Sequence, residues 1–133
     1  MKTVFLDTVG LLAQWDASDQ WHAAADRAGE LLVASGAKTI STTFVLLECG
    51  NAAARKPYRA LIDQLRDEME KSNRLIVPTQ EDWDAAWTAY RQGPPGDAGI
   101  VDHVSFAVMR RLEVTDAFTN DRHFKTAGFR TLF

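Results

Sequence analysis

The hydrophobic positions along the chain change their period from one segment to the next. Short apolar runs rich in β-branched residues alternate with longer segments in which apolar residues recur every three or four positions. The first kind of segment is typical of buried strands and the second of amphipathic helices. Because parallel strands are joined by crossover helices, this alternation predicts an α/β fold with a mainly parallel sheet.

The pattern predicts four to five strands and six helices. Strands are expected over residues 3–6, 38–42, 74–77 and 117–119, and a short terminal strand over 129–133. Helices are expected over residues 10–15, 19–34, from 43 through 48, 57–71, 79–90 and 101–112, and residues 92–99 (QGPPGDAG) form a loop. Ser18 and Thr43 are the expected caps of two helices, and Thr79 with Asp82 matches a capping box.

Apolar stripes identify the helix faces that are expected to pack on the core. In the helix over residues 57–71, the stripe consists of Leu61, Leu65 and Met69, and four charged residues are left facing water: Asp63, Arg66, Glu70 and Lys71. Trp83, Trp87 and Tyr90 line one face of the next helix. We expect these three aromatic residues in the core and not as a platform for stacking.

Composition narrows the class of protein. With 133 residues, 46% hydrophobic and 25% charged, the chain suits a single globular domain over residues 1–133 that needs no disulfide. An acid within the first apolar stretch argues against a signal peptide or a membrane span, so a cytoplasmic protein is expected. The single cysteine, Cys49, has no partner and is expected to be a buried thiol.

The net charge of −3 argues against binding nucleic acid through the overall field of the protein. Basic residues nevertheless gather in two stretches, one in the middle of the chain and one near its end: Arg55, Lys56 and Arg59, and Arg110, Arg111, Arg122, Lys125 and Arg130. Contact with RNA would therefore have to be local.

Four acids occupy positions where the ends of elements should meet. Asp7 and Asp121 follow the first and fourth predicted strands, and ligands of open parallel sheets bind beyond the carboxyl ends of the strands. Glu48 and Asp102 are expected early in helices whose leading loops can reach the same edge. Helix capping explains Glu48 and Asp102 about equally well when each is taken alone.

Carboxylates held close together repel one another, and a divalent cation relieves the repulsion. Oxygen ligands without thiolate suit Mg²⁺ or Mn²⁺, ions that share phosphate oxygens and lower the pKa of bound water. The expected chemistry is hydrolysis of a phosphodiester.

Neighbouring polar residues are candidates for orienting these acids. Thr8 follows Asp7 and Thr119 precedes Asp121 by two positions, while Asn51 and Ser105 lie one helical turn after Glu48 and Asp102: these four are the expected supporting residues. No histidine is expected to act as a general base. His103 and His123 offer no pair of ligands with matched spacing, although His123 is a candidate for contact with RNA.

Two further aspartates compete for a place in the site. The fourth predicted strand lies between Asp116 and Asp121. The two carboxylates should therefore be about 15 Å apart, at opposite edges of the sheet. We therefore expect Asp121 in the site and Asp116 as a turn residue. Asp97 in the Gly-Pro-rich loop is expected to be a turn former that can approach the site.

Four sequence segments resemble the PIN-domain ribonucleases, particularly the VapC-type toxins of bacterial toxin–antitoxin pairs. They are FLDT at Asp7, TTFVLLECGNAAAR around Glu48, VDHVSFAVMRRL from Asp102 and AFTNDRHFKTAGF through Asp121. The resemblance implies a three-layer α/β/α sandwich and makes Asp7, Glu48, Asp102 and Asp121 the metal-binding acids. It also implies Mg²⁺ or Mn²⁺, an RNA substrate cut to 3′-hydroxyl and 5′-phosphate ends, a homodimer, and a small antitoxin encoded next to it.

Two other functions remain open from the sequence. A phosphotransferase with Asp7 as nucleophile would need a second acid two positions later, where Val9 stands. A non-catalytic PIN-fold interaction module or RNA-processing scaffold is the other alternative, and the presence of all four acids disfavours it. The acidic surroundings of the predicted site depart from the basic RNA groove that is usual in the family.

Overall fold

The computed structural model describes residues 2–133, and its centre is a parallel sheet of five strands. The strands are β1 (Thr3–Leu6), β2 (Lys38–Thr42), β3 (Leu75–Ile76), β4 (Asp116–Phe118) and β5 (Arg130–Thr131), in the spatial order β3-β2-β1-β4-β5. Every pairing is parallel. β1 lies in the middle, because Phe5 pairs with Ile40 of β2 on one side and with Ala117 of β4 on the other.

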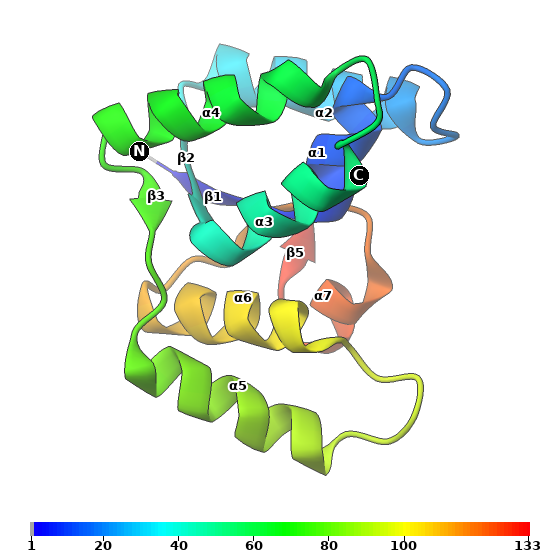
Figure 1. The fold of residues 1–133 in the computed structure, drawn as a ribbon. Coiled ribbons are helices and arrows are strands. Elements are labelled where there is room, and N and C mark those ends of the chain that lie inside the picture. The colour runs from blue at the N-terminus through cyan, green and yellow to red at the C-terminus, as the bar shows by residue number, and fades with distance from the viewer. Residues whose placement is uncertain (1) are drawn as a thin grey trace.

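Helices cover both faces of the sheet, which confirms the three-layer arrangement (Figure 1). On one side lie α1 (Thr8–Trp15), α2 (His22–Ser35) and α4 (Arg59–Lys71), and on the other lie α5 (Gln80–Gln92), α6 (Ile100–Arg111) and α7 (Arg122–Thr126). α3 (Thr43–Ala52) packs on α1 and α4 and also reaches α6. α5 packs chiefly on α6, and so it forms an outer layer.

Strands are added to the sheet first on one side of β1 and then on the other. From β1 the chain moves outward through β2 to β3, then crosses the sheet through α5 and α6 to reach β4 on the other side of β1. Such a change of side leaves a crevice beyond the carboxyl ends of the two strands where it occurs, here β1 and β4.

The core consists of the three inner strands, β2, β1 and β4, and the helix faces that cover them. Phe5, Phe118, Phe124, Met69 and Met109 are its largest fully buried side chains. The β-branched and aromatic residues that predicted β1 and β4 are buried because both faces of a parallel sheet are covered by helices. Cys49 is buried and unpaired, as expected.

The strands agree with the prediction to within a few residues, but two helix caps were predicted wrongly. Thr42, not Thr43, caps α3 by accepting a hydrogen bond from the backbone N–H of Val45. Ser18 does not cap α2, which begins at His22, and its hydroxyl donates instead to Asp16. The capping box of Thr79 and Asp82 at the start of α5 is confirmed.

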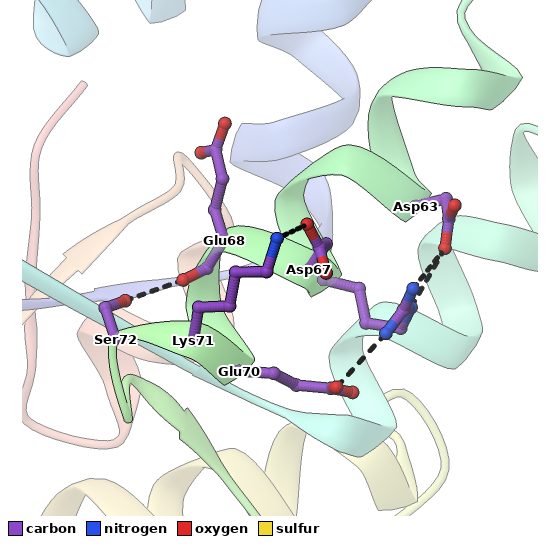
Figure 2. Close-up of polar contacts among 7 residues, drawn as sticks. Asp63, Asp67, Glu68, Glu70, Lys71 and Ser72 are labelled. Carbon is purple, nitrogen blue, oxygen red and sulfur yellow. Dashed lines mark hydrogen bonds and ion pairs between the residues drawn. The ribbon is translucent and has the colours of Figure 1, made fainter.

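The outer face of α4 carries charged residues paired with one another, as Figure 2 shows. Arg66 donates to Asp63 and Glu70, and Lys71 pairs with Asp67 at 2.8 Å. The predicted apolar stripe of α4 is partly wrong. Met69 is fully buried, but Leu61 is exposed and Ile62 takes its place in the core.

The aromatic face of α5 was also predicted wrongly. Trp83, Trp87 and Tyr90 are 42%, 36% and 48% exposed, so they form a surface and not part of the core. The residues that α5 buries are Asp82 and Ala86.

Within residues 2–133, no helix has both the length and the apolar character needed to cross a membrane.

Candidate metal centre

Asp7 follows β1 and is the N-cap residue of α1, and its carboxylate is buried where the carboxyl ends of β1 and β4 lie side by side. The residue is 2% exposed, and its Oδ2 accepts a hydrogen bond of 2.9 Å from the hydroxyl of Thr119. The backbone N–H of Asp7 also donates to the carbonyl of Phe118. Two segments 112 residues apart in sequence are thus joined at this carboxylate.

A glycine in α1 permits this close approach. A Cβ added at Gly10 would overlap the carbonyl oxygen of Phe118 at the end of β4. The first turn of α1 therefore lies directly against β4, because no side chain stands between them.

Thr119 connects the two acids that follow β1 and β4. Its hydroxyl donates to Asp7 and accepts a hydrogen bond of 3.1 Å from the backbone N–H of Asp121. Asp121 in turn caps α7, where its Oδ1 accepts from the backbone N–H of His123. The Thr-x-Asp sequence thus fixes the chain between β4 and α7 with both carboxylates at one edge.

The other two acids reach this edge from helices. Asp102 is the third residue of α6 and is partly buried. Glu48 lies in the second turn of α3, later in its helix than expected, and its Oε1 accepts a hydrogen bond of 2.7 Å from the hydroxyl of Thr8. Thr8 and Thr119 therefore each donate to one acid, but not to the acid that lies nearest in sequence: Thr8 donates to Glu48 and not to Asp7, and Thr119 donates to Asp7 and not to Asp121.

The tightest group of potential metal ligands is Asp102, Asp121 and His123, whose ligand atoms all lie within 4.8 Å of one another. Sequence reasoning missed His123. The sequence was examined for pairs of histidines. The signal that it contains is a carboxylate and an imidazole two residues apart at the start of a short helix: Asp121 and His123.

The charges of the four acids affect one another across the crevice. Burial raises the pKa of Asp7 to about 7, with a further increase from the charge of Asp102. Burial also raises the pKa of Asp102 to about 6, and the charges of Asp121 and Glu48 add to this effect. Asp7 and Asp102 thus lie close enough to neighbouring carboxylates for those charges to oppose their ionisation.

The pKa of His123 is raised as well, but for an imidazole this shift favours the charged form. Its pKa is raised, first by the hydrogen bond from its ring to the carbonyl of Gly96 and then by its contact with Asp121. A positive charge is therefore favoured at the same place where the acids resist a negative one.

The remaining candidates lie at different distances from this cluster. Asp116 is a buried strand residue and not a turn residue, and Lys2 and Arg130 bind it at the amino-terminal side of β4. Asp97 lies in a turn, as expected, where its backbone N–H donates to the carbonyl of Pro94, and its Oδ2 lies 3.3 Å from His103 Nε2. Among residues 2–133, no hydrogen bond joins Asn51 to Glu48 or Ser105 to Asp102.

The donor atoms suit a hard divalent cation. Carboxylate oxygens predominate, two carboxyls have pKa values raised by burial and mutual repulsion, and the ligand atoms of three side chains share one small volume. A doubly positive ion would relieve that repulsion and keep the acids ionised at neutral pH.

Comparison with known proteins gives a match at the level of structure. No protein-family model matches the chain, and no curated protein sequence matches it. Among solved structures, it is similar to the crystal structure of Mycobacterium tuberculosis VapC20, a toxin that cleaves the sarcin–ricin loop. The identity is 28%, the similarity covers 95% of each chain, and the TM-score is 0.77.

Proposed function

We propose that this chain, a PIN-domain protein of the VapC type, is a divalent-metal-dependent endoribonuclease and the toxin of a toxin–antitoxin pair. Residues 1–133 would form one PIN-like domain acting in the cytoplasm. The observation that most supports the activity is the gathering of Asp7, Glu48, Asp102 and Asp121 at the crevice between β1 and β4. Repulsion between these carboxylates lowers the stability of the fold unless a cation is bound.

We assign the metal to Asp7, Asp102 and Asp121, and we propose Mg²⁺ or Mn²⁺ as the ion. When bound, such an ion lowers the pKa of water and offsets negative charge on a phosphodiester. Thr119 holds the carboxylate of Asp7 in place through its hydroxyl. Glu48, which is oriented by Thr8, is placed to accept the proton that the attacking water loses.

Ser105 and Asn51 are proposed as supporting residues because of their positions in the helices. Ser105 is buried one turn after Asp102, and its hydroxyl has no hydrogen-bond partner among residues 2–133. We propose that this hydroxyl orients Asp102 or a bound water. Asn51 is exposed one turn after Glu48 and is available to a water or to the substrate.

The proposed substrate is RNA, cut to leave a 3′-hydroxyl and a 5′-phosphate. VapC20 is described as a toxin that cleaves the sarcin–ricin loop, so a hairpin containing that loop is the first RNA to test, beside an unstructured RNA of equal length. Cleavage of both RNAs at comparable rates would indicate that structure in the RNA is not recognised.

The central test is Asp102→Asn, which keeps the shape of the side chain and removes its charge. Metal-dependent cleavage should fall by at least about 100-fold, since a charged metal ligand is lost while the fold is retained. Asp26→Asn is the matched control, because Asp26 is exposed on α2 and the same charge is removed. An Asp102→Asn variant as active as Asp26→Asn would refute the proposal.

The proposed protein partner is a small antitoxin that occupies or blocks the acidic site. The expected result is that co-expression with the product of a short neighbouring gene abolishes growth inhibition. If no neighbouring product binds the chain, the alternative of an RNA-processing enzyme or scaffold gains support.

A homodimer is the other proposed assembly, and the exposed aromatic residues of α5 support it. Phe44 of α3 packs edge-on against Trp83, and the contacts continue from Trp83 to Trp87 and from Trp87 to Tyr90. Leu47 of α3 is also exposed. Aromatic residues are enriched at protein interfaces, and soluble monomers rarely expose large apolar patches.

The test of this interface is Trp87→Glu, which should convert a dimer to a monomer in analytical ultracentrifugation. Trp21→Glu is the control, because Trp21 is also exposed but lies at the start of α2. A monomeric wild-type protein, or dimers of equal strength in both variants, would contradict the assignment.

A further inference from the structure

The ring of His123 is held at both of its nitrogens. Nε2 lies 3.1 Å from the carbonyl oxygen of Gly96, and Nδ1 lies 2.9 Å from Oδ1 of Asp121. Gly96 belongs to the loop between α5 and α6, and Asp121 is the cap of α7. The ring thus bridges the loop that precedes Asp102 and the helix that follows Asp121.

The contact with Gly96 determines which nitrogen carries the proton in the neutral ring. A carbonyl oxygen only accepts hydrogen bonds, so Nε2 must donate. Nδ1 then faces an oxygen of Asp121, and the position between these two atoms is occupied by a proton in the ion-free protein or by a metal ion that displaces this proton. Histidines that bind metals typically donate their other N–H to a carbonyl or carboxylate in this way.

The spacing of the two acceptors also suits a shared cation. Two ligands at right angles on an octahedral ion with bonds of about 2.1 Å lie about 3 Å apart. The separation between Nδ1 of His123 and Oδ1 of Asp121 is 2.9 Å. Asp102 supplies the third ligand atom within the same 4.8 Å group.

We propose that His123 is a nitrogen ligand of the metal beside Asp102 and Asp121, and that this mixed donor set makes the site prefer Mn²⁺ to Mg²⁺. Imidazole nitrogen binds first-row transition ions better than it binds Mg²⁺, and Mn²⁺ shares with Mg²⁺ the octahedral, oxygen-rich sites that carboxylates form. The proposal rests on the proposed function, because it concerns the ion at the same acidic site, and it adds a ligand and a choice of ion.

The direct measurement is pulsed electron paramagnetic resonance of Mn²⁺ bound to the purified full chain. A coordinated imidazole gives a ¹⁴N modulation in the electron spin echo, which carboxylate and water ligands do not give. We expect this modulation in the wild type and its loss in His123→Asp, which keeps an oxygen ligand and so still binds Mn²⁺.

The other two histidines provide matched controls. His103 lies next to Asp102 in sequence and contacts Asp97, whereas His22 bonds to the carbonyl of Ala13. The nitrogen modulation should persist in His103→Gln and in His22→Gln. Its loss in His103→Gln with retention in His123→Asp would overturn the assignment of the ligand.

Calorimetric titration of the same proteins tests the preference for the ion. The wild type should bind Mn²⁺ at least about tenfold more tightly than Mg²⁺, and His123→Ala should weaken Mn²⁺ binding by about 10- to 100-fold with a smaller effect on Mg²⁺. Equal losses for both ions would refute the preference.

The two proposals fail in different ways. If the wild type binds Mn²⁺ and cleaves RNA but shows no nitrogen modulation, the inference about His123 is wrong and the proposed function stands. If the wild type binds neither ion at millimolar concentration, both are wrong.

Discussion

Two buried aspartates of the same sheet show how position separates a functional acid from a structural one. Asp116 is paired with Lys2 and Arg130, and these contacts outweigh burial and lower the pKa of its carboxyl. Among residues 2–133 Asp7 pairs with no cation, and its hydrogen bonds from the Thr119 hydroxyl and the Thr8 backbone are outweighed by burial and neighbouring acids, which raise its pKa to about 7. Buried acids without a protein counter-charge are typical of sites that bind an ion.

The raised pKa of Asp7 predicts that stability depends on pH when no metal is present. The folded-state pKa of about 7 exceeds the ordinary aspartate value of 3.8, so the folded protein binds more protons between these values. The free energy of unfolding in EDTA should therefore fall as the pH rises from about 4 to about 7, by about 4 kcal/mol if Asp7 is considered alone. Urea denaturation at pH 4 and pH 8 measures the difference.

Asp7→Asn isolates this contribution. In EDTA at pH 8 the variant should be more stable than the wild type, because an uncompensated buried charge is removed. Asp116→Asn should be less stable than the wild type at the same pH, because it loses two ion pairs. If Asp7→Asn destabilises the ion-free protein as much as Asp116→Asn, then Asp7 is a structural residue.

The elements of the fold could largely be predicted from the sequence, whereas the side chains that they leave exposed could not. Apolar runs located β1, β2 and β4 because both faces of these strands are buried. The helical period of α5 identified the stripe of Trp83, Trp87 and Tyr90 but could not show what covers it. α5 packs on α6 and not on the sheet, and it does so through Ala86 and through Asp82, which binds Arg111.

The acids of the site were predictable, but the imidazole was not. Asp7 and Asp121 follow parallel strands, and general rules for such sheets place ligands there. Recognising His123 required knowing that the loop over residues 93–99 folds back to put the carbonyl of Gly96 beside it. Gly96 has a φ of 94°, a conformation that glycine adopts readily. The pattern of apolar residues does not predict the path of such a loop.

The contact of α1 with β4 gives a prediction for that helix. Gly10→Ala should destabilise the protein by about 1–3 kcal/mol, because the methyl group would overlap the carbonyl of Phe118 and push α1 away from the strand. Thermal unfolding followed by circular dichroism measures the loss.

Gly50→Ala in α3 is the matched substitution. A Cβ at Gly50 meets no atom within 4 Å, so the better helix propensity of alanine should stabilise the protein by up to about 1 kcal/mol. The same substitution is therefore expected to lower the free energy of unfolding in α1 and to raise it in α3. Equal effects would show that α1 does not lie against β4 as described.

At the scale of the molecule, the net charge of −3 and an acidic crevice predict that RNA binding depends on the metal. A non-cleavable RNA analogue should bind weakly in EDTA and at least about tenfold more tightly with Mn²⁺, because the ion removes the repulsion between phosphate and carboxylates. Fluorescence anisotropy measures the affinity. Tight binding in EDTA would indicate that basic surface residues, not the acidic site, hold the RNA.

The pairing of β4 with β1 also determines when, during synthesis of the chain, the acidic site can form. The hydroxyl that holds Asp7 and the carboxylate of Asp121 are synthesised more than a hundred residues after Asp7 itself. Until then one edge of β1 has no neighbouring strand. The acidic site is therefore incomplete until nearly all of these residues have been synthesised, and any chemistry that needs all four acids belongs to the folded chain and not to the nascent one.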